Sequence, residues 1–176
     1  MQNFQQRIID APAAEVGALL DRLGSPQDPI WPTPAWSPLS LDAGLTVGSS
    51  GGHGRIRYSV AAHEPGRRVR FAFAPGLGMS GYHEFLITPE GPARCRISHT
   101  AAGRLEGKML LMWPLVIRWL HEALLQDAFD NIQREATNHL PHPARWSARV
   151  RLLRLVFGRR TRGPAEAGRP SRSRRQ

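Results

Sequence analysis

The stretch RIRYSVAAHEPGRRVRFAF, residues 55–73, decides the fold of this chain. It holds two segments in which apolar and polar residues alternate, and the turn residues 64–66 separate them. The apolar set is Ile56, Tyr58, Val60, Val69, Phe71 and Phe73. A period of two with one apolar face is typical of antiparallel strands that pack one side on a core and leave the other in water. The stretch therefore predicts a β-hairpin whose arginines are solvated.

Two further segments repeat this alternation, and another strand is predicted at the N-terminus. Residues 82–87 and 94–99 have a period of two, and the residues on their apolar faces are His83, Phe85, Ile87, Cys95, Ile97 and His99. Residues 4–9 predict a strand, followed by a helix that opens with Pro12, because proline is favoured in the first helical turn, and ends at Gly24. We therefore expect an antiparallel sheet with one short helix after its first strand.

From Trp113 the apolar period becomes 3.6 residues, which predicts a helix that runs to about Asn138. Its apolar stripe consists of Trp113, Ile117, Leu120, Leu124, Ala128 and Ile132. Polar residues, among them Gln126 and Asp130, lie on the opposite side. We expect the carboxylates of Glu84, Glu106 and Asp127 to be solvated rather than to act as catalytic partners.

Residues 25–53 contain many residues that break regular structure. Four prolines fall within ten residues and are interleaved with Trp31 and Trp36, which predicts a loop or an edge segment because proline cannot donate to a central ladder. Residues 48–54 are rich in glycine. A phosphate-binding loop would need a Gly-Lys-Ser/Thr ending and a following helix, and both are lacking, so we favour a flexible turn into the next strand.

The net charge of +10 comes from the C-terminal part of the chain. Residues 1–140 hold 13 basic and 13 acidic residues, whereas residues 141–176 hold eleven arginines and one glutamate. The high isoelectric point is therefore no indication of specific nucleic-acid binding by the folded part. A single cysteine, Cys95, excludes an intrachain disulfide, and the longest apolar run, residues 109–117, is far shorter than a membrane span of about twenty residues.

The order of these elements resembles the helix-grip fold of the START, Bet v 1 and polyketide cyclase superfamily, often called SRPBCC. The segments that carry the resemblance are GGHGRIRY (51–58), EPGRRVRF (64–71), GYHEF (81–85), Trp113-Pro114 and Leu120-His121, and they look like an actinobacterial branch. The resemblance covers about residues 3–138. It implies an α+β domain in which a curved antiparallel sheet wraps around a long C-terminal helix, with a cavity between them for a small hydrophobic or amphipathic ligand such as a lipid. Some members cyclise or dehydrate polyketides and many only bind or carry a ligand, and the superfamily has no universal catalytic motif.

We expect ten residues to line this cavity, because they lie on the inward faces of the strands and of the long helix. They are Tyr58, Phe71, Phe73, His83, Phe85, Ile97, His99, Ile117, His121 and Leu124. Filling a solid core is the alternative fate of such residues. Hydrophobic contact would supply the affinity, and His83, His99 and Tyr58 would orient a polar group of the ligand.

The inward histidines leave several roles open. If Ile87 pairs with Cys95, then His83 faces His99 at about 5 Å between Cβ atoms. The two imidazoles could bond to each other and to Tyr58 through water, hold a polar group of a ligand, or act as general base in a cyclase or dehydratase. A zinc ion held with His121 is a further reading, and we favour pocket or core histidines with satisfied hydrogen bonds and no metal or other cofactor.

The basic C-terminal part, residues 139–176, predicts an amphipathic helix at about 144–158 and disorder beyond it. The helix could lie on an anionic membrane surface, contact a protein partner through residues 144–160, or pack back on its own domain. Non-specific nucleic-acid binding is a weaker reading. The N-terminus lacks a secretory signal, and we expect a cytoplasmic protein that touches a membrane at most peripherally.

Overall fold

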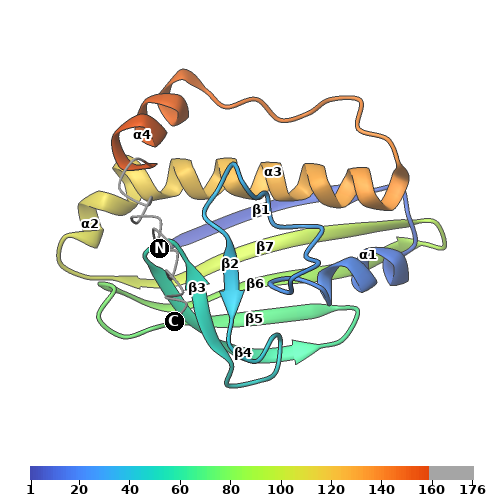
Figure 1. Cartoon of the computed structure of the whole chain (residues 1–176), viewed down its shortest axis with the longest axis horizontal. Helices are drawn as coiled ribbons and strands as arrows, with labels where there is room; N and C mark the ends of the chain where they lie inside the picture. Colours follow the sequence, from blue (N-terminus) through green and yellow to red (C-terminus); the bar gives the residue numbers. More distant parts are fainter. Residues whose placement is uncertain (159–176) are drawn as a thin grey trace, which may run out of the picture.

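A seven-stranded sheet curves around one long helix in the computed structural model, which describes residues 1–158 (Figure 1). The strands are β1 (Gln2–Ile9), β2 (Leu39–Leu41), β3 (Ser50–His53), β4 (Ile56–Glu64), β5 (Arg68–Phe73), β6 (Met79–Gly91) and β7 (Arg94–Leu105). Their order is β1-β7-β6-β5-β4-β3-β2, and every neighbouring pair is antiparallel. This confirms the predicted helix-grip architecture.

The long helix is interrupted near its start. The helical elements are α1 (Ala13–Leu20), α2 (Met109–Met112), the π-helical turn η1 (Trp113–Ile117), α3 (Arg118–Thr137) and α4 (Ala148–Gly158). Pro114 stands at the beginning of η1, where its missing N–H disturbs the helical ladder, and such a disturbance is a recognised cause of a π-bulge. The predicted helix thus continues through η1 into α3, and α2 precedes it.

The C-terminal half of α3 packs against a solid core. Phe129 and Ile132 are fully buried there with residues of α1 and the sheet. Asp130, which the helical period places on the polar side, is also buried at 6% exposure, which corrects that expectation. Its Oδ1 accepts a hydrogen bond from Arg7 Nη1 of β1 at 2.5 Å, because α3 lies close against β1 and a buried carboxylate needs a charged partner.

The hairpin between β6 and β7 has a different register from the one expected. Ile87 pairs with Ile97, so His83 lies opposite Ala101 and not opposite His99. The turn is tight, with Gly91 already paired to Arg94 and a bulge between Pro89 and Gly91, and the observed pairing differs from the expected one by two residues. A shift of two leaves every side chain on its predicted face, because the side-chain period of a strand is two.

The glycine-rich segment is a strand and not the flexible turn expected. Gly51 and Gly52 belong to β3, which lies between β2 and β4. A Cβ atom at Gly51 would stand 1.9 Å from the carbonyl oxygen of Ser40, so only glycine permits the close approach of β2. This strand carries His53 to the interior.

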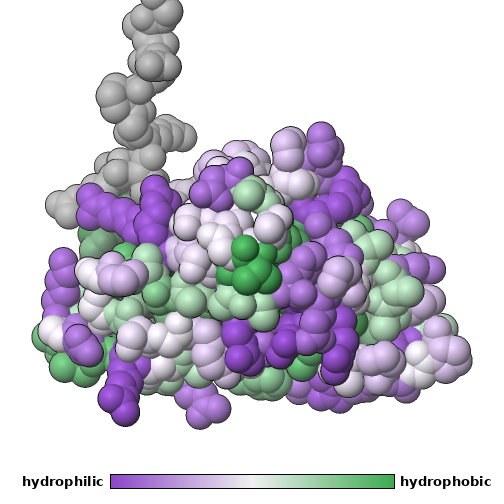
Figure 2. Space-filling view, turned by 90° about the horizontal axis from the view of Figure 1, so that it is seen from below, coloured by the Kyte–Doolittle hydropathy of each residue, from purple (hydrophilic) through white to green (hydrophobic). Residues whose placement is uncertain are grey.

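Charged residues pair across the strands on the outer face of the sheet. Arg70 Nε donates to Glu84 Oε2 at 2.7 Å, and its guanidinium lies 4.2 Å from the centre of the Tyr82 ring. Figure 2, seen from below Figure 1, shows hydrophilic side chains interspersed with hydrophobic ones over that side of the molecule. The arginines of the alternating strands therefore lie on the solvent-exposed face of the sheet.

Candidate ligand cavity

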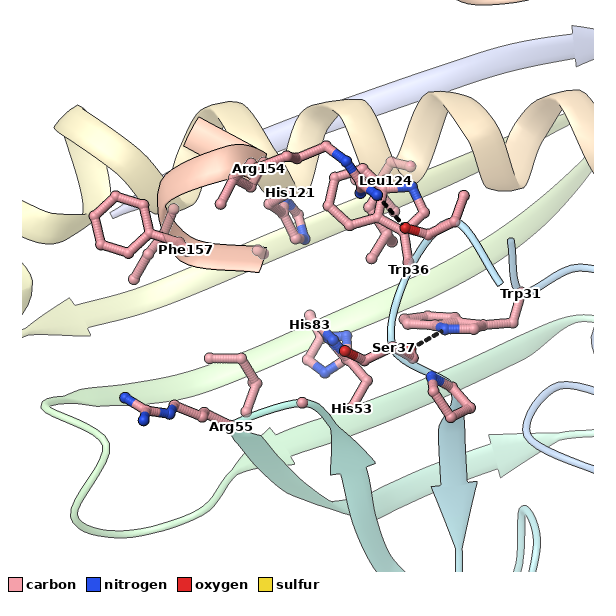
Figure 3. Close-up of a pocket in the computed structure, with 18 of the residues that line it drawn as sticks. Trp31, Trp36, Ser37, His53, Arg55, His83, His121, Leu124, Arg154 and Phe157 are labelled. Atoms are coloured by element: carbon pink, nitrogen blue, oxygen red, sulfur yellow. Dashed lines mark hydrogen bonds between the residues drawn. The ribbon is translucent and has the colours of Figure 1, made fainter. Parts of the chain in front are cut away.

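A cavity of about 760 Å³ lies between the sheet and the N-terminal half of α3 (Figure 3). This volume is in the range of sites that enclose a drug-sized molecule. The residue 31–38 loop, the β3–β4 turn and the C-terminal end of α4 complete its wall. Most of the wall is apolar, with Phe73, Ile117 and Leu124 among its residues.

Seven of the ten expected lining residues face this cavity. They are Phe73, His83, Phe85, His99, Ile117, His121 and Leu124. The other three, Tyr58, Phe71 and Ile97, are buried in the core and do not line it. Tyr58 and Phe71 support the cavity wall from behind, because their rings lie 4.6 Å and 4.9 Å from the ring of His83.

The structure brings the three expected histidines together despite the shifted register. His99 Nε2 lies 3.4 Å from His83 Nδ1, and the ring centres of His99 and His121 are 5.0 Å apart. His83 and His99 are diagonal neighbours on β6 and β7, and His121 of α3 lies beside His99. Burial lowers the pKa of His83 and His99 well below the usual value and that of His121 to about 4, so all three are neutral at pH 7.

A fourth histidine, His53, belongs to the same cavity and was not among the expected residues. Its ring centre lies 4.8 Å from that of Trp31 and 6.0 Å from that of Tyr58. Burial, the neighbouring His121 and Arg57 lower its pKa to about 4. His53 could not be predicted from the sequence, because the glycines of β3 interrupt the alternation of apolar and polar residues that indicates a strand.

Together these residues form a continuous row of rings along the cavity. In order, the row consists of Trp31, His53, Tyr58, His83, His99, His121 and Trp113. No Asp or Glu is among the residues that line the cavity in the described part of the chain. Residues 1–158 also contain no group of three or more His, Cys, Asp or Glu arranged to hold a metal ion.

The cavity edge is closed by a cluster that we call the aromatic clasp, formed by Trp36, Trp146, Asp127 and Arg154. Asp127 Oδ2 on α3 accepts hydrogen bonds from the indole N–H groups of Trp36 at 2.7 Å and Trp146 at 2.9 Å. The Arg154 guanidinium lies 4.3 Å and 4.0 Å from these two rings. Asp127 is therefore a bonded carboxylate and not the solvated one expected.

The clasp holds α4 against its own domain. Val150 is buried, and Arg154, Leu155 and Phe157 of α4 line the cavity. Arg154 also donates to the carbonyl oxygen of Ala35 in the loop, so one side chain ties α4 to the cavity edge. The helix expected at 144–158 is found at Ala148–Gly158, and the disorder predicted beyond it lies outside the described residues.

Comparison with known proteins places the fold but not the activity. No family model matches the chain, and no curated protein matches it in sequence. Norcoclaurine synthase from Thalictrum flavum is similar in structure with a TM-score of 0.60 and 13% identity, over 80% of this chain and 95% of the other. CalU16 from Micromonospora echinospora gives 0.53 and 15% over 91% and 85%, and a Thermobifida fusca protein gives 0.60 and 16% over 80% and 99%. The TM-scores show a shared helix-grip fold, and at 13–16% identity the similarity extends no further than the fold.

Proposed function

We propose that this protein binds a small hydrophobic or amphipathic molecule, such as a lipid or an aromatic compound, in the cavity between the sheet and α3. The observation that carries the proposal is a volume of about 760 Å³ with a mostly apolar wall and a row of neutral imidazoles. Apolar contact supplies the affinity, and the histidines orient a polar group. The fold and the segments that resemble SRPBCC proteins, including the actinobacterial branch, support this assignment.

The test is to fill the cavity and to measure binding of a neutral apolar probe, N-phenyl-1-naphthylamine, by its fluorescence. Ala101 is buried and lines the cavity, so Ala101→Phe should abolish probe binding. Ala18 is exposed on α1, and Ala18→Phe is the matched control that should bind the probe as the wild type does. Equal binding by both variants would contradict the proposal, and native mass spectrometry of the purified protein should show a bound small molecule.

A polyketide cyclase or dehydratase is the alternative activity, and the contact between His83 and His99 favours it. A neutral imidazole can accept a proton from an enolisable substrate. The cavity supplies no carboxylate to orient it or to stabilise its charge, so binding is better supported than catalysis. Norcoclaurine synthase, which has been seen with dopamine and hydroxybenzaldehyde, shows that an enzyme can have this fold. Catalysis requires that His83→Gln and His99→Gln abolish turnover of a poly-β-keto thioester while the ligand still binds.

We further propose that α2, η1 and α4 form a membrane-contacting surface. The exposed large apolar residues Leu110, Leu111, Leu115, Leu152, Leu155, Val156 and Phe157 gather on these elements. Arg149 Nη2 donates to the carbonyl oxygen of Leu115, so α4 and η1 are adjacent. Exposed apolar side chains, together with the exposed Arg149 and Arg151 on α4, match an anionic bilayer, where they would enter the interface peripherally from the cytoplasm. Residues 1–158 contain no helix long and apolar enough to cross a membrane.

Vesicle co-sedimentation tests this surface. The wild type should bind vesicles of phosphatidylcholine with 30% phosphatidylglycerol at low salt, and pure phosphatidylcholine much less. The pair Leu111→Glu and Leu152→Glu should abolish binding, whereas Val47→Glu, at an equally exposed apolar residue between β2 and β3, should not. Unchanged binding in the first two variants would overturn the surface, as would equal binding to both vesicle types. If the wild type binds no vesicles but retains a protein partner, these helices form a protein-binding surface instead.

A further inference from the structure

The hydrogen-bond pattern of the histidine cluster assigns the tautomers of its members. Nδ1 atoms of His99 and His121 are buried and have no hydrogen-bond partner in the described part of the chain. Buried N–H groups without an acceptor are rarer in proteins than acceptors without a donor, so the proton of each neutral ring belongs on Nε2. His99 therefore donates from Nε2 to Nδ1 of His83, 3.4 Å away.

The tautomer of His99 fixes the tautomer of His83, whose ring lines the cavity. Because Nδ1 of His83 accepts the bond from His99, the proton of His83 stands on Nε2. Neither Nε2 of His83 nor Nε2 of His121 is bonded to a protein group among residues 1–158, and both rings line the cavity. In Figure 3, His83 and His53 rise from the sheet and His121 approaches from α3. The apolar cavity thus presents N–H donors that no protein group among residues 1–158 satisfies, and a ligand in the cavity can accept from them.

The charged side chains that line the cavity in the described part of the chain are all positive. Arg55 and Arg154 belong to its wall, and Arg57 acts on His53 from β4. Acidic groups near the cavity lie outside its wall and are bonded elsewhere: Asp127 to the two clasp indoles, Asp28 to the N–H groups of Ile30 and Trp31, and Glu122 to Asn3 and Arg118. A cation in this space would meet guanidinium groups and no carboxylate.

We propose that the ligand is an acidic amphiphile, with an apolar body in the cavity and a carboxylate that accepts N–H bonds from His83 and His121. The inference deepens the proposed binding function and rests on it. A carboxylate beside these rings favours their protonated form, so binding couples to proton uptake by the cluster. A buried pair of this kind stabilises the complex through charge-assisted hydrogen bonds.

Matched acid and alcohol probes test the head group by isothermal titration calorimetry of the full chain. The pairs are dodecanoic acid with dodecan-1-ol, and 2-naphthoic acid with 2-naphthalenemethanol. We expect at least one acid to bind about tenfold tighter than its alcohol at pH 6.5, which corresponds to about 1.4 kcal/mol. Equal or tighter binding of the alcohols would overturn the acidic head group and leave the binding function standing. Failure of all four probes to bind would overturn the acidic head group, and failure of N-phenyl-1-naphthylamine as well would overturn the binding function.

Proton uptake tests the role of the histidines separately. At pH 5.5, the binding enthalpy of the acid should depend on the ionisation enthalpy of the buffer, with uptake of up to one proton. The variant with both His83→Gln and His121→Gln keeps N–H donors but cannot take up a proton, so the uptake should vanish while part of the acid preference remains. His63→Gln, outside the cavity beside Asp21, is the control and should behave as the wild type. Because His53 and His99 remain in the double variant, uptake that persists there would mean that neither His83 nor His121 takes up the proton, and would overturn their assignment as the carboxylate-binding pair.

Discussion

The two halves of α3 face two different interiors. Its C-terminal half, with Phe129 and Ile132, packs into a core in which the large side chains are fully buried. Its N-terminal half, with Leu120 and His121, faces a cavity where Nδ1 of His99 and Nδ1 of His121 are buried without a hydrogen-bond partner among residues 1–158. The same sheet covers both halves, so the fold alone does not make the difference.

The contrast shows how one fold separates stability from binding. A buried polar atom without a partner costs about 1–3 kcal/mol, and within residues 1–158 the hollow half has two such nitrogens, Nδ1 of His99 and Nδ1 of His121. The filled half offsets this cost with close packing, which is the main source of stability in a domain of this size. We therefore expect the filled half to respond to substitution mainly in the free energy of unfolding, and the hollow half mainly in ligand affinity.

The largest expected effect is truncation in the filled half. Phe129→Ala should lower the free energy of unfolding by about 4 kcal/mol, because it removes a fully buried ring and leaves a cavity that close packing cannot refill. Phe73→Ala, which borders the existing cavity, should lower it by about half of that or less. Urea unfolding followed by circular dichroism measures both. Equal losses would remove the distinction between the halves.

The second-largest expected effect is a loss of folding stability at acidic pH, caused by the buried histidines of the hollow half. The pKa of His53 and that of His121 are about 4 in the folded protein, below the 6.5 of an unfolded chain. The unfolded chain therefore binds more protons between pH 6.5 and 4, and stability should fall through this window by up to about 1.4 kcal/mol per pH unit for each histidine. Urea midpoints at pH 6.5, 5.5 and 4.5 test this. The double variant with His53→Gln and His121→Gln should show a flatter dependence, and parallel curves would contradict the burial of neutral rings.

The smallest expected effect concerns the aromatic clasp. Arg154→Ala removes a guanidinium that lies against two indole rings, which should cost about 1 kcal/mol and loosen α4. Amide hydrogen exchange in α4 should become faster while exchange in α3 stays the same. Arg151, exposed on the same helix, provides the control, since Arg151→Ala should leave α4 protected. Loosening of α4 by both variants to the same extent would contradict a specific clasp.

Local periodicity explains why most of the fold was predictable from the sequence. The alternation around Phe71 and the 3.6-residue stripe through Leu124 each place side chains on a face, and that placement survives even the two-residue shift in the β6–β7 register. The histidines His83, His99 and His121 could be predicted to converge for the same reason. Seven of the expected residues line the cavity because inward faces are a local property.

Features that depend on contacts between distant residues could not be predicted. His53 reaches the cavity through a four-residue strand of which two residues are glycine, so the strand carries no periodic signal. Asp127 meets Trp36 across 91 residues of chain, and Asp130 meets Arg7 across 123. No local pattern indicates which polar residue on a helix will find such a partner, so both carboxylates were expected in the wrong environment.

A matched pair of alanine substitutions tests the central claim, a hollow and a filled half under one helix, most directly. Ala101 lines the cavity and Ala128 lies in the filled core, and both are fully buried. By urea unfolding, Ala128→Phe should lower the free energy of unfolding by about 3 kcal/mol through overpacking, whereas Ala101→Phe should change it by less than about 1 kcal/mol because its ring can extend into the adjoining cavity. Equal destabilisation by the two substitutions would contradict the account.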